Sequence, residues 1–178
     1  IPELQKDFSS LTSPAGIQEL TEIFALYLTD YQNVVLRLAG ISVDPGPAIA
    51  SRHKVQLADL AHEGVNYGVA LEIIEWKNAT NRALYLCNEK GFPLLEVDRR
   101  FHIGPYQFSA YLKSEYVSLL QKQGTLELAE MNELVVKSID EAQQAIKEYF
   151  RNRAAHDAKT VVDDWKTENV YPYQGEAK

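Results

Sequence analysis

The stretch VALEIIEWKNATNRALYLCNEKGFPLLEV, residues 69–97, decides the fold class of this chain. It opens with an alternation of more and less apolar residues over 69–76, which is the two-residue period of a strand with one face in the core. Residues 78–81, Asn-Ala-Thr-Asn, are typical of a turn, and 83–87 is a second apolar run. The pattern therefore predicts two consecutive strands.

A tight turn follows the second strand. Residues 88–91 are Asn-Glu-Lys-Gly, and Gly91 can adopt the positive φ that such turns need. We predict a third strand at 92–97 and a fourth at Phe108–Leu112, where apolar and polar residues alternate again. Consecutive strands joined by short turns predict a mostly antiparallel sheet with the order of a meander.

A helix is predicted in the part of the sequence that precedes these strands. Ser13 followed by Pro14 is a helix start, because a capping hydroxyl precedes a proline at the first helical position. Apolar residues then recur at helical spacing from Ile17 to Tyr31.

The segment between this helix and residue 69 is less regular. Residues 34–38 are β-branched and apolar, which predicts a strand that ends at Gly40. Residues 46–66 resemble a linker, with room for one short strand at 55–60.

The last third of the chain is predicted to be helical, after a short helix that Ser114 caps. Helical spacing runs without a breaker from Glu133 to Glu168, and 36 such residues extend about 54 Å. A globular body of this chain length is only roughly 40 Å across. We therefore expect the helix either to break near 152–156 or to project as an arm.

Together these elements predict an α+β fold in three segments. The segments are a helix–strand unit (1–45), a mixed α+β core (46–130) and a long helical segment with its tail (131–178).

Composition excludes several classes of protein. The 178 residues carry a net charge of −7, which disfavours nonspecific contact with nucleic acid, and no apolar run approaches the ~20 residues of a membrane helix. The single cysteine, Cys87, excludes an internal disulfide and fits a reducing cytoplasm. The chain begins Ile1-Pro2 and ends on a polar run, so we expect a fragment of a longer protein.

The sequence offers few candidates for catalysis. The four histidines are far apart without ligand-spaced partners, and Cys87 lies in a predicted strand, where a buried thiol is inert. Arg99, Arg100 and His102 form a basic cluster on a predicted loop; it could meet a phosphate or be a solvated loop. Trp76 and Trp165 are interpreted as core or interface anchors.

Two stretches carry a resemblance to a known family. They are LTEIFALYLTDYQNVVLRLAG (20–40) with Val43-Asp44-Pro45, and IEWK (74–77) with RALYLCNEKGF (82–92). They resemble the junction between the nucleotide-binding and transducer (middle) domains of GHKL ATPases, a superfamily that includes gyrase B, MutL and the ninety-kilodalton heat-shock chaperones. Trp165-Lys166 and Tyr171-Pro172-Tyr173 resemble segments of large bacterial chaperone-like members.

The resemblance implies a role without an ATP site of its own. The family's Glu-x-x-x-Asn helix and Asp-x-Gly-x-Gly loop are not convincingly present, so ATP and Mg²⁺ would bind to a preceding domain of the same chain. In the family, a lysine of the transducer reaches the γ-phosphate, and Lys122, with Lys113 second, matches that place here. The resemblance further implies a downstream helical domain as a neighbour and allows a homodimer.

Three hypotheses follow. The first is a transducer that relays the nucleotide state of the preceding domain through its C-terminal helix. The second is a stand-alone module that binds a peptide or protein and has no nucleotide function. The third is a small enzyme that uses Arg99, Arg100 and His102, which would require a deep pocket at their loop.

Overall fold

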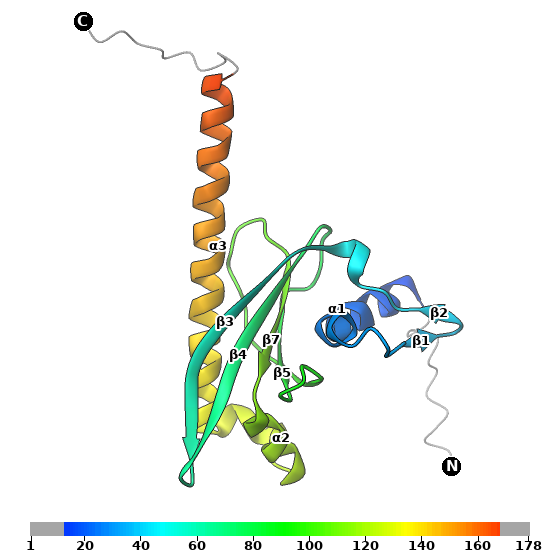
Figure 1. Cartoon of the computed structure of the whole chain (residues 1–178), viewed down its shortest axis with the longest axis vertical. Helices are drawn as coiled ribbons and strands as arrows, with labels where there is room; N and C mark the ends of the chain where they lie inside the picture. The colour runs from blue at the N-terminus through cyan, green and yellow to red at the C-terminus, as the bar shows by residue number, and fades with distance from the viewer. Residues whose placement is uncertain (1–12, 168–178) are drawn as a thin grey trace, which may run out of the picture.

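A sheet with helices on both faces is the framework of the molecule. The computed structural model describes residues 13–167, and Figure 1 shows helix α1 on one side of the sheet and the long helix α3 on the other. In chain order the elements are α1 (Pro14–Asp30), β1 (Arg37–Leu38), β2 (Ile41–Ser42), η3 (Gly46–Ala48), β3 (Ile49–His62), β4 (Val65–Trp76), β5 (Ala83–Cys87), β6 (Pro93–Val97), β7 (Phe108–Lys113), α2 (Glu115–Lys122), η4 (Leu126–Met131) and α3 (Glu133–Thr167). The predicted α+β fold class is confirmed.

The order of strands in the main sheet is β3-β4-β7-β5-β6. Strand β7 pairs antiparallel with β4 and parallel with β5, so it separates two strands that follow each other in the chain. The predicted meander is therefore wrong at this point, and it holds only within the hairpins β3-β4 and β5-β6. The physical reason is that β7 is apolar on both faces, with Phe108–Leu112 entirely buried, and only a central position covers both faces.

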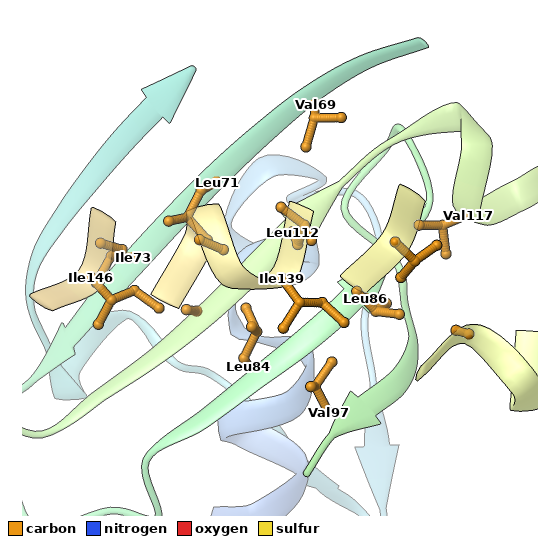
Figure 2. Close-up of a cluster of buried hydrophobic side chains, with 14 of the residues drawn as sticks. Val69, Leu71, Ile73, Leu84, Leu86, Val97, Leu112, Val117, Ile139 and Ile146 are labelled. Atoms are coloured by element: carbon orange, nitrogen blue, oxygen red, sulfur yellow. The ribbon is translucent and has the colours of Figure 1, made fainter. Parts of the chain in front are cut away.

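Two hydrophobic cores result from the alternation of side chains in the central strands. Figure 2 shows the larger core, in which Leu71, Leu84 and Leu112 of the sheet point toward Ile139 and Ile146 of α3. The smaller core lies under α1, and its buried residues are Ala25, Leu26, Ile74, Trp76, Ala83, Tyr85, Cys87 and Tyr111. Because successive residues of a strand point to opposite faces, one apolar run such as 83–87 supplies both cores.

The N-terminal helix forms as its sequence predicts. Ser13 is the N-cap, and its Oγ accepts a hydrogen bond from the Gly16 N–H at 3.1 Å.

The prediction of a strand over 34–38 is largely wrong, because only Arg37–Leu38 of this segment pairs, with Ile41–Ser42. Ala39 and Gly40 both have positive φ, which closes a two-residue hairpin and leaves the preceding residues outside it.

Most of strand β3 was not evident from the sequence, although the short strand considered at 55–60 lies within it. It covers Ile49–His62 and pairs with β4 along its length, so the linker expected at 46–66 is wrong. β3 is an outer strand, and nearly all its residues are partly or fully exposed. An exposed strand does not need the apolar alternation by which strands are recognised.

Helix α3 is unbroken and projects from the body. Its 35 residues extend about 52 Å, and Figure 1 shows its C-terminal half beyond the sheet. Of the two outcomes expected for this helix, the arm is confirmed. No helix within residues 13–167 combines the length and apolar character needed to cross a bilayer.

The turn at Gly91 gives a direct test of how α1 sits on the sheet. Gly91 has φ +86°, and a Cβ there would lie 3.1 Å from Cδ2 of the buried Leu26, whereas Gly124 has φ +71° and open space around it. We expect Gly91→Ala to lower the free energy of unfolding by about 2–3 kcal/mol, from backbone strain plus overpacking. Gly124→Ala carries the strain alone and should cost about 1 kcal/mol. Urea unfolding measures both, and equal losses would contradict the close packing of α1 on this turn.

Candidate functional site

The exposed half of α3 is the most distinctive surface of the molecule. Phe150 is the last fully buried residue of the helix, and beyond it only Arg153 and Asp157 are partly covered among the described side chains. Val161 and Trp165 are 46% and 49% exposed. Single exposed apolar side chains are common on protein surfaces, whereas a contiguous group of them is typical of surfaces that bind another protein.

The apolar residues of this half form one line. Ala154, Ala158, Val161 and Trp165, which we call the arm stripe, are separated by four, three and four residues. Residues at this spacing lie on the same face of a helix. The sequence analysis found this continuation of the helical spacing, and the structure places it outside the core.

A cavity lies at the N-terminal end of the arm stripe, next to Ala154. It has a volume of about 300 Å³ and lies between the loop of residues 102–106 and α3, where Lys147, Phe150, Arg151 and Ala154 line it. We call it the foot pocket. Tyr106 stacks on Phe150 with ring centroids 5.1 Å apart, which gives the pocket an aromatic wall with two cations at its side.

The predicted basic cluster is divided by this arrangement. His102 lines the foot pocket, whereas the Arg99 guanidinium lies 3.2 Å from Asp140 on α3. The backbone carbonyl of Arg100 accepts a hydrogen bond from Gln143, and its side chain is exposed. The three residues therefore do not converge on one point.

Polar contacts fasten α3 to the sheet where the arm begins. Arg153 lies 3.6 Å from Glu75 and 3.3 Å from Asp157, and the Tyr106 hydroxyl donates to Asp157 at 2.7 Å. Ser51 in turn donates to Glu75 at 3.0 Å. These bonds join β3, β4, the 102–106 loop and α3, so the base of the arm is fixed in direction.

The two lysines singled out by the family resemblance lie in different surroundings. Lys122 is exposed at the end of α2. The Lys113 ammonium is largely buried and lies 2.8 Å from the Glu72 carboxylate. A role for either lysine at a phosphate stays a prediction.

Glu72 belongs to a chain of charges beneath α1. Arg52 contacts it at 2.6 Å and reaches Asp30, the last residue of α1, at 2.6 Å through its other amino group. The Glu72 side chain is only 4% exposed, so its two cationic partners compensate for the lost hydration. We interpret this chain, Asp30–Arg52–Glu72–Lys113, as the device that fixes α1 on the sheet.

Cys87 is a buried free thiol. Burial raises the pKa of the Cys87 thiol far above its ordinary value, although the nearby Lys113 lowers it in part, so the thiol stays protonated. Within residues 13–167, no three His, Cys, Asp or Glu side chains are placed to hold a metal ion.

A polar pocket opens beside α1. Its volume is about 330 Å³, and Gln18, Glu22, Trp76 and Thr80 are among the residues that line it. Glu22 is 4% exposed, and its Oε1 accepts a hydrogen bond from the Gln18 side chain at 3.1 Å. Sequence reasoning missed this pocket, because an isolated Glu within a helical pattern is usually a solvated residue.

The comparisons with known proteins add no relative. No family model matches the sequence, and searches of curated proteins and of solved structures found no significant match. The site must therefore be interpreted from its own geometry.

The buried Glu22 predicts a pH dependence of stability. Burial raises the pKa of Glu22, and the hydrogen bond from Gln18 only partly opposes this. The folded state therefore holds the proton more tightly than the unfolded chain. Its stability falls as the pH rises from the ordinary pKa of a glutamate, 4.5, through the raised pKa of Glu22.

Glu22→Gln keeps an acceptor for Gln18 and removes this ionisation. We expect the variant to gain stability relative to the parent chain between pH 4 and pH 7, measured by urea unfolding at each pH. A difference between the two proteins that does not change with pH would contradict this account.

Proposed function

We propose that this chain is a non-catalytic module that binds another protein through the arm stripe of α3. The exposure of Val161 and Trp165 on the projecting half of α3 carries the proposal. Tryptophan is enriched among the residues that dominate binding energy, because it buries a large apolar surface with few rotatable bonds.

The anchored base of the arm supports this function. The first half of α3 is buried through Ile139, Ala142, Ile146 and Phe150, so the helix direction is set before any partner arrives. A surface that is ordered in advance loses less conformational entropy on binding. A free peptide of the same sequence would lose more.

A photo-crosslinking experiment tests the proposal. Benzoylphenylalanine replaces Ala158 on the stripe or, as the control, His156 on the opposite face, in the full chain expressed in its own host. We expect a discrete crosslinked product from position 158 and a several-fold lower yield from position 156. Equal yields from the two faces would contradict the proposal.

A second candidate function is the relay implied by the family resemblance. The observation that favours it is the unbroken course of α3 from beneath the sheet to beyond the body. In this proposal a preceding ATP-binding domain shifts the packing on the sheet, and α3 carries the shift to a downstream helical domain in the cytoplasm. ATP and Mg²⁺ bind to the preceding domain, and Lys122 contacts the γ-phosphate there.

Calorimetry tests the relay. We expect no heat of binding when ATP–Mg²⁺ is titrated into residues 1–178, and binding when it is titrated into the full-length protein. In the full-length protein, Lys122→Ala should lower ATP turnover, whereas Lys137→Ala, a change of another exposed lysine, should not. Micromolar binding of ATP by residues 1–178 would overturn the relay.

A further inference from the structure

The foot pocket carries three basic side chains that no acid of the described chain pairs with. His102 comes from the loop between β6 and β7, and Lys147 and Arg151 come from α3. Figure 1 shows this loop beside the middle of α3. Within residues 13–167 none of the three side chains has a hydrogen bond or an ion pair, and all three are exposed. No Asp or Glu is among the residues that line the pocket.

The two cations of α3 lie on one face of the helix. Lys147 and Arg151 are four residues apart, a spacing that brings side chains together, and like charges at this spacing destabilise a helix. The neighbouring acids have other partners, since Glu148 accepts a hydrogen bond from Gln144 at 3.1 Å and Asp157 is bound by two other side chains. An anion in the pocket would relieve the repulsion between the two cations.

Arg82 fixes the loop of the pocket without lining the pocket itself. Its guanidinium donates hydrogen bonds to the backbone carbonyls of Phe101, Gly104 and Tyr106. No carboxylate of the described residues forms an ion pair with Arg82. Three carbonyls that would repel an anion are thus bound to a cation, and the unpaired charge of Arg82 makes the potential around the loop more positive.

We propose that the foot pocket binds the phosphate group of a phosphate monoester, with the side chains of Lys147, Arg151 and His102 as its hydrogen-bond donors. The inference concerns a second site and does not depend on the binding of a protein by the arm stripe.

Charge and the number of donors favour a phosphate over a carboxylate. A phosphate monoester carries about −1.5 to −2 charges near pH 7 and three acceptor oxygens, whereas a carboxylate carries one charge and two oxygens. Arginine pairs with two phosphate oxygens through its planar fork, and lysine acts as a point charge on a flexible stem. Three donor side chains from two sides of a cavity of about 300 Å³ therefore suit the larger and more highly charged group.

An NMR titration of residues 1–178 with inorganic phosphate, at pH 7.5 and constant ionic strength, tests the site. We expect amide shifts confined to residues 102–106 and 147–154, with a dissociation constant on the order of 1 mM, because few atoms make contact. Acetate, which carries one charge, should bind at least tenfold more weakly. Binding of this strength is far weaker than the micromolar range in which ATP would contradict the relay.

Paired substitutions on α3 test the donors. Lys147→Gln combined with Arg151→Gln removes two of them and should weaken phosphate binding at least tenfold. Lys137→Gln combined with Lys159→Gln removes the same charge from exposed positions of the same helix and should leave the affinity within twofold. All four side chains are exposed, so we expect both variants to fold, and thermal unfolding checks this.

Two further probes distinguish the sources of the phosphate. They are a short peptide with one phosphoserine, blocked at both ends, and glycerol 3-phosphate. Tighter binding of the peptide would support the site and identify the ligand as a phosphorylated segment of a protein. Tighter binding of glycerol 3-phosphate would support the site and identify the ligand as a small phosphorylated compound.

Three results would overturn the proposal. The first is the absence of shifts at tens of millimolar phosphate, and the second is a set of shifts that the substitutions at 147 and 151 leave unchanged. The third is acetate binding as tight as that of phosphate. None of these results bears on the arm stripe, because its test is the crosslink from position 158.

Discussion

Burial of the sheet on both faces is the constraint on which this structure depends. The central strands β4, β7 and β5 carry apolar side chains on both faces, and no single layer of helices could cover them. Helix α1 therefore closes one face, and α2 with α3 closes the other. The position of β7 in the middle of the sheet follows from the same constraint, since an outer strand would expose one of its faces to water.

The chain of charges under α1 restricts where this helix can lie on the nonpolar surface of the sheet. Hydrophobic contact alone would allow α1 to slide on the sheet, whereas Arg52 must reach Asp30 and Glu72 at the same time. The Glu72 side chain is 4% exposed, and a buried charge without a partner is costly, so an arrangement that keeps its cationic partners within reach is preferred. We interpret these ion pairs as fixing the position of α1 more than as adding to the net stability of the fold.

Local sequence signals predicted the local structure well. The cap at Ser13, the turn at Gly91 and the continuous helix after Glu133 all depend on contacts within a few residues, and all three are present. The order of the strands depends on which faces of the sheet are covered by helices that are distant in the sequence. The periodicity of apolar residues within a strand does not indicate this. Most of strand β3 was not predicted for a related reason, because a strand at the edge of the sheet does not need a buried face.

The candidate site, like the fold, could be predicted from the sequence only in part. The arm stripe was visible as a helical repeat of apolar residues, although the sequence could not say that it lies outside the body. The foot pocket joins a loop at 102–106 to residues that follow more than 40 positions later, and only the folded chain brings them together. Sequence patterns therefore located the arm stripe but not the foot pocket.

The outer edge of β3 has a consequence for misassembly. Its register with β4 shifts twice, between Ile49 and Ser51 and between Leu57 and Leu60, and Lys54 lies between the two shifts. Bulges and charged side chains interrupt the regular row of peptide groups that a strand from another molecule would extend. These features lower the tendency of this edge to pair with a strand from another molecule.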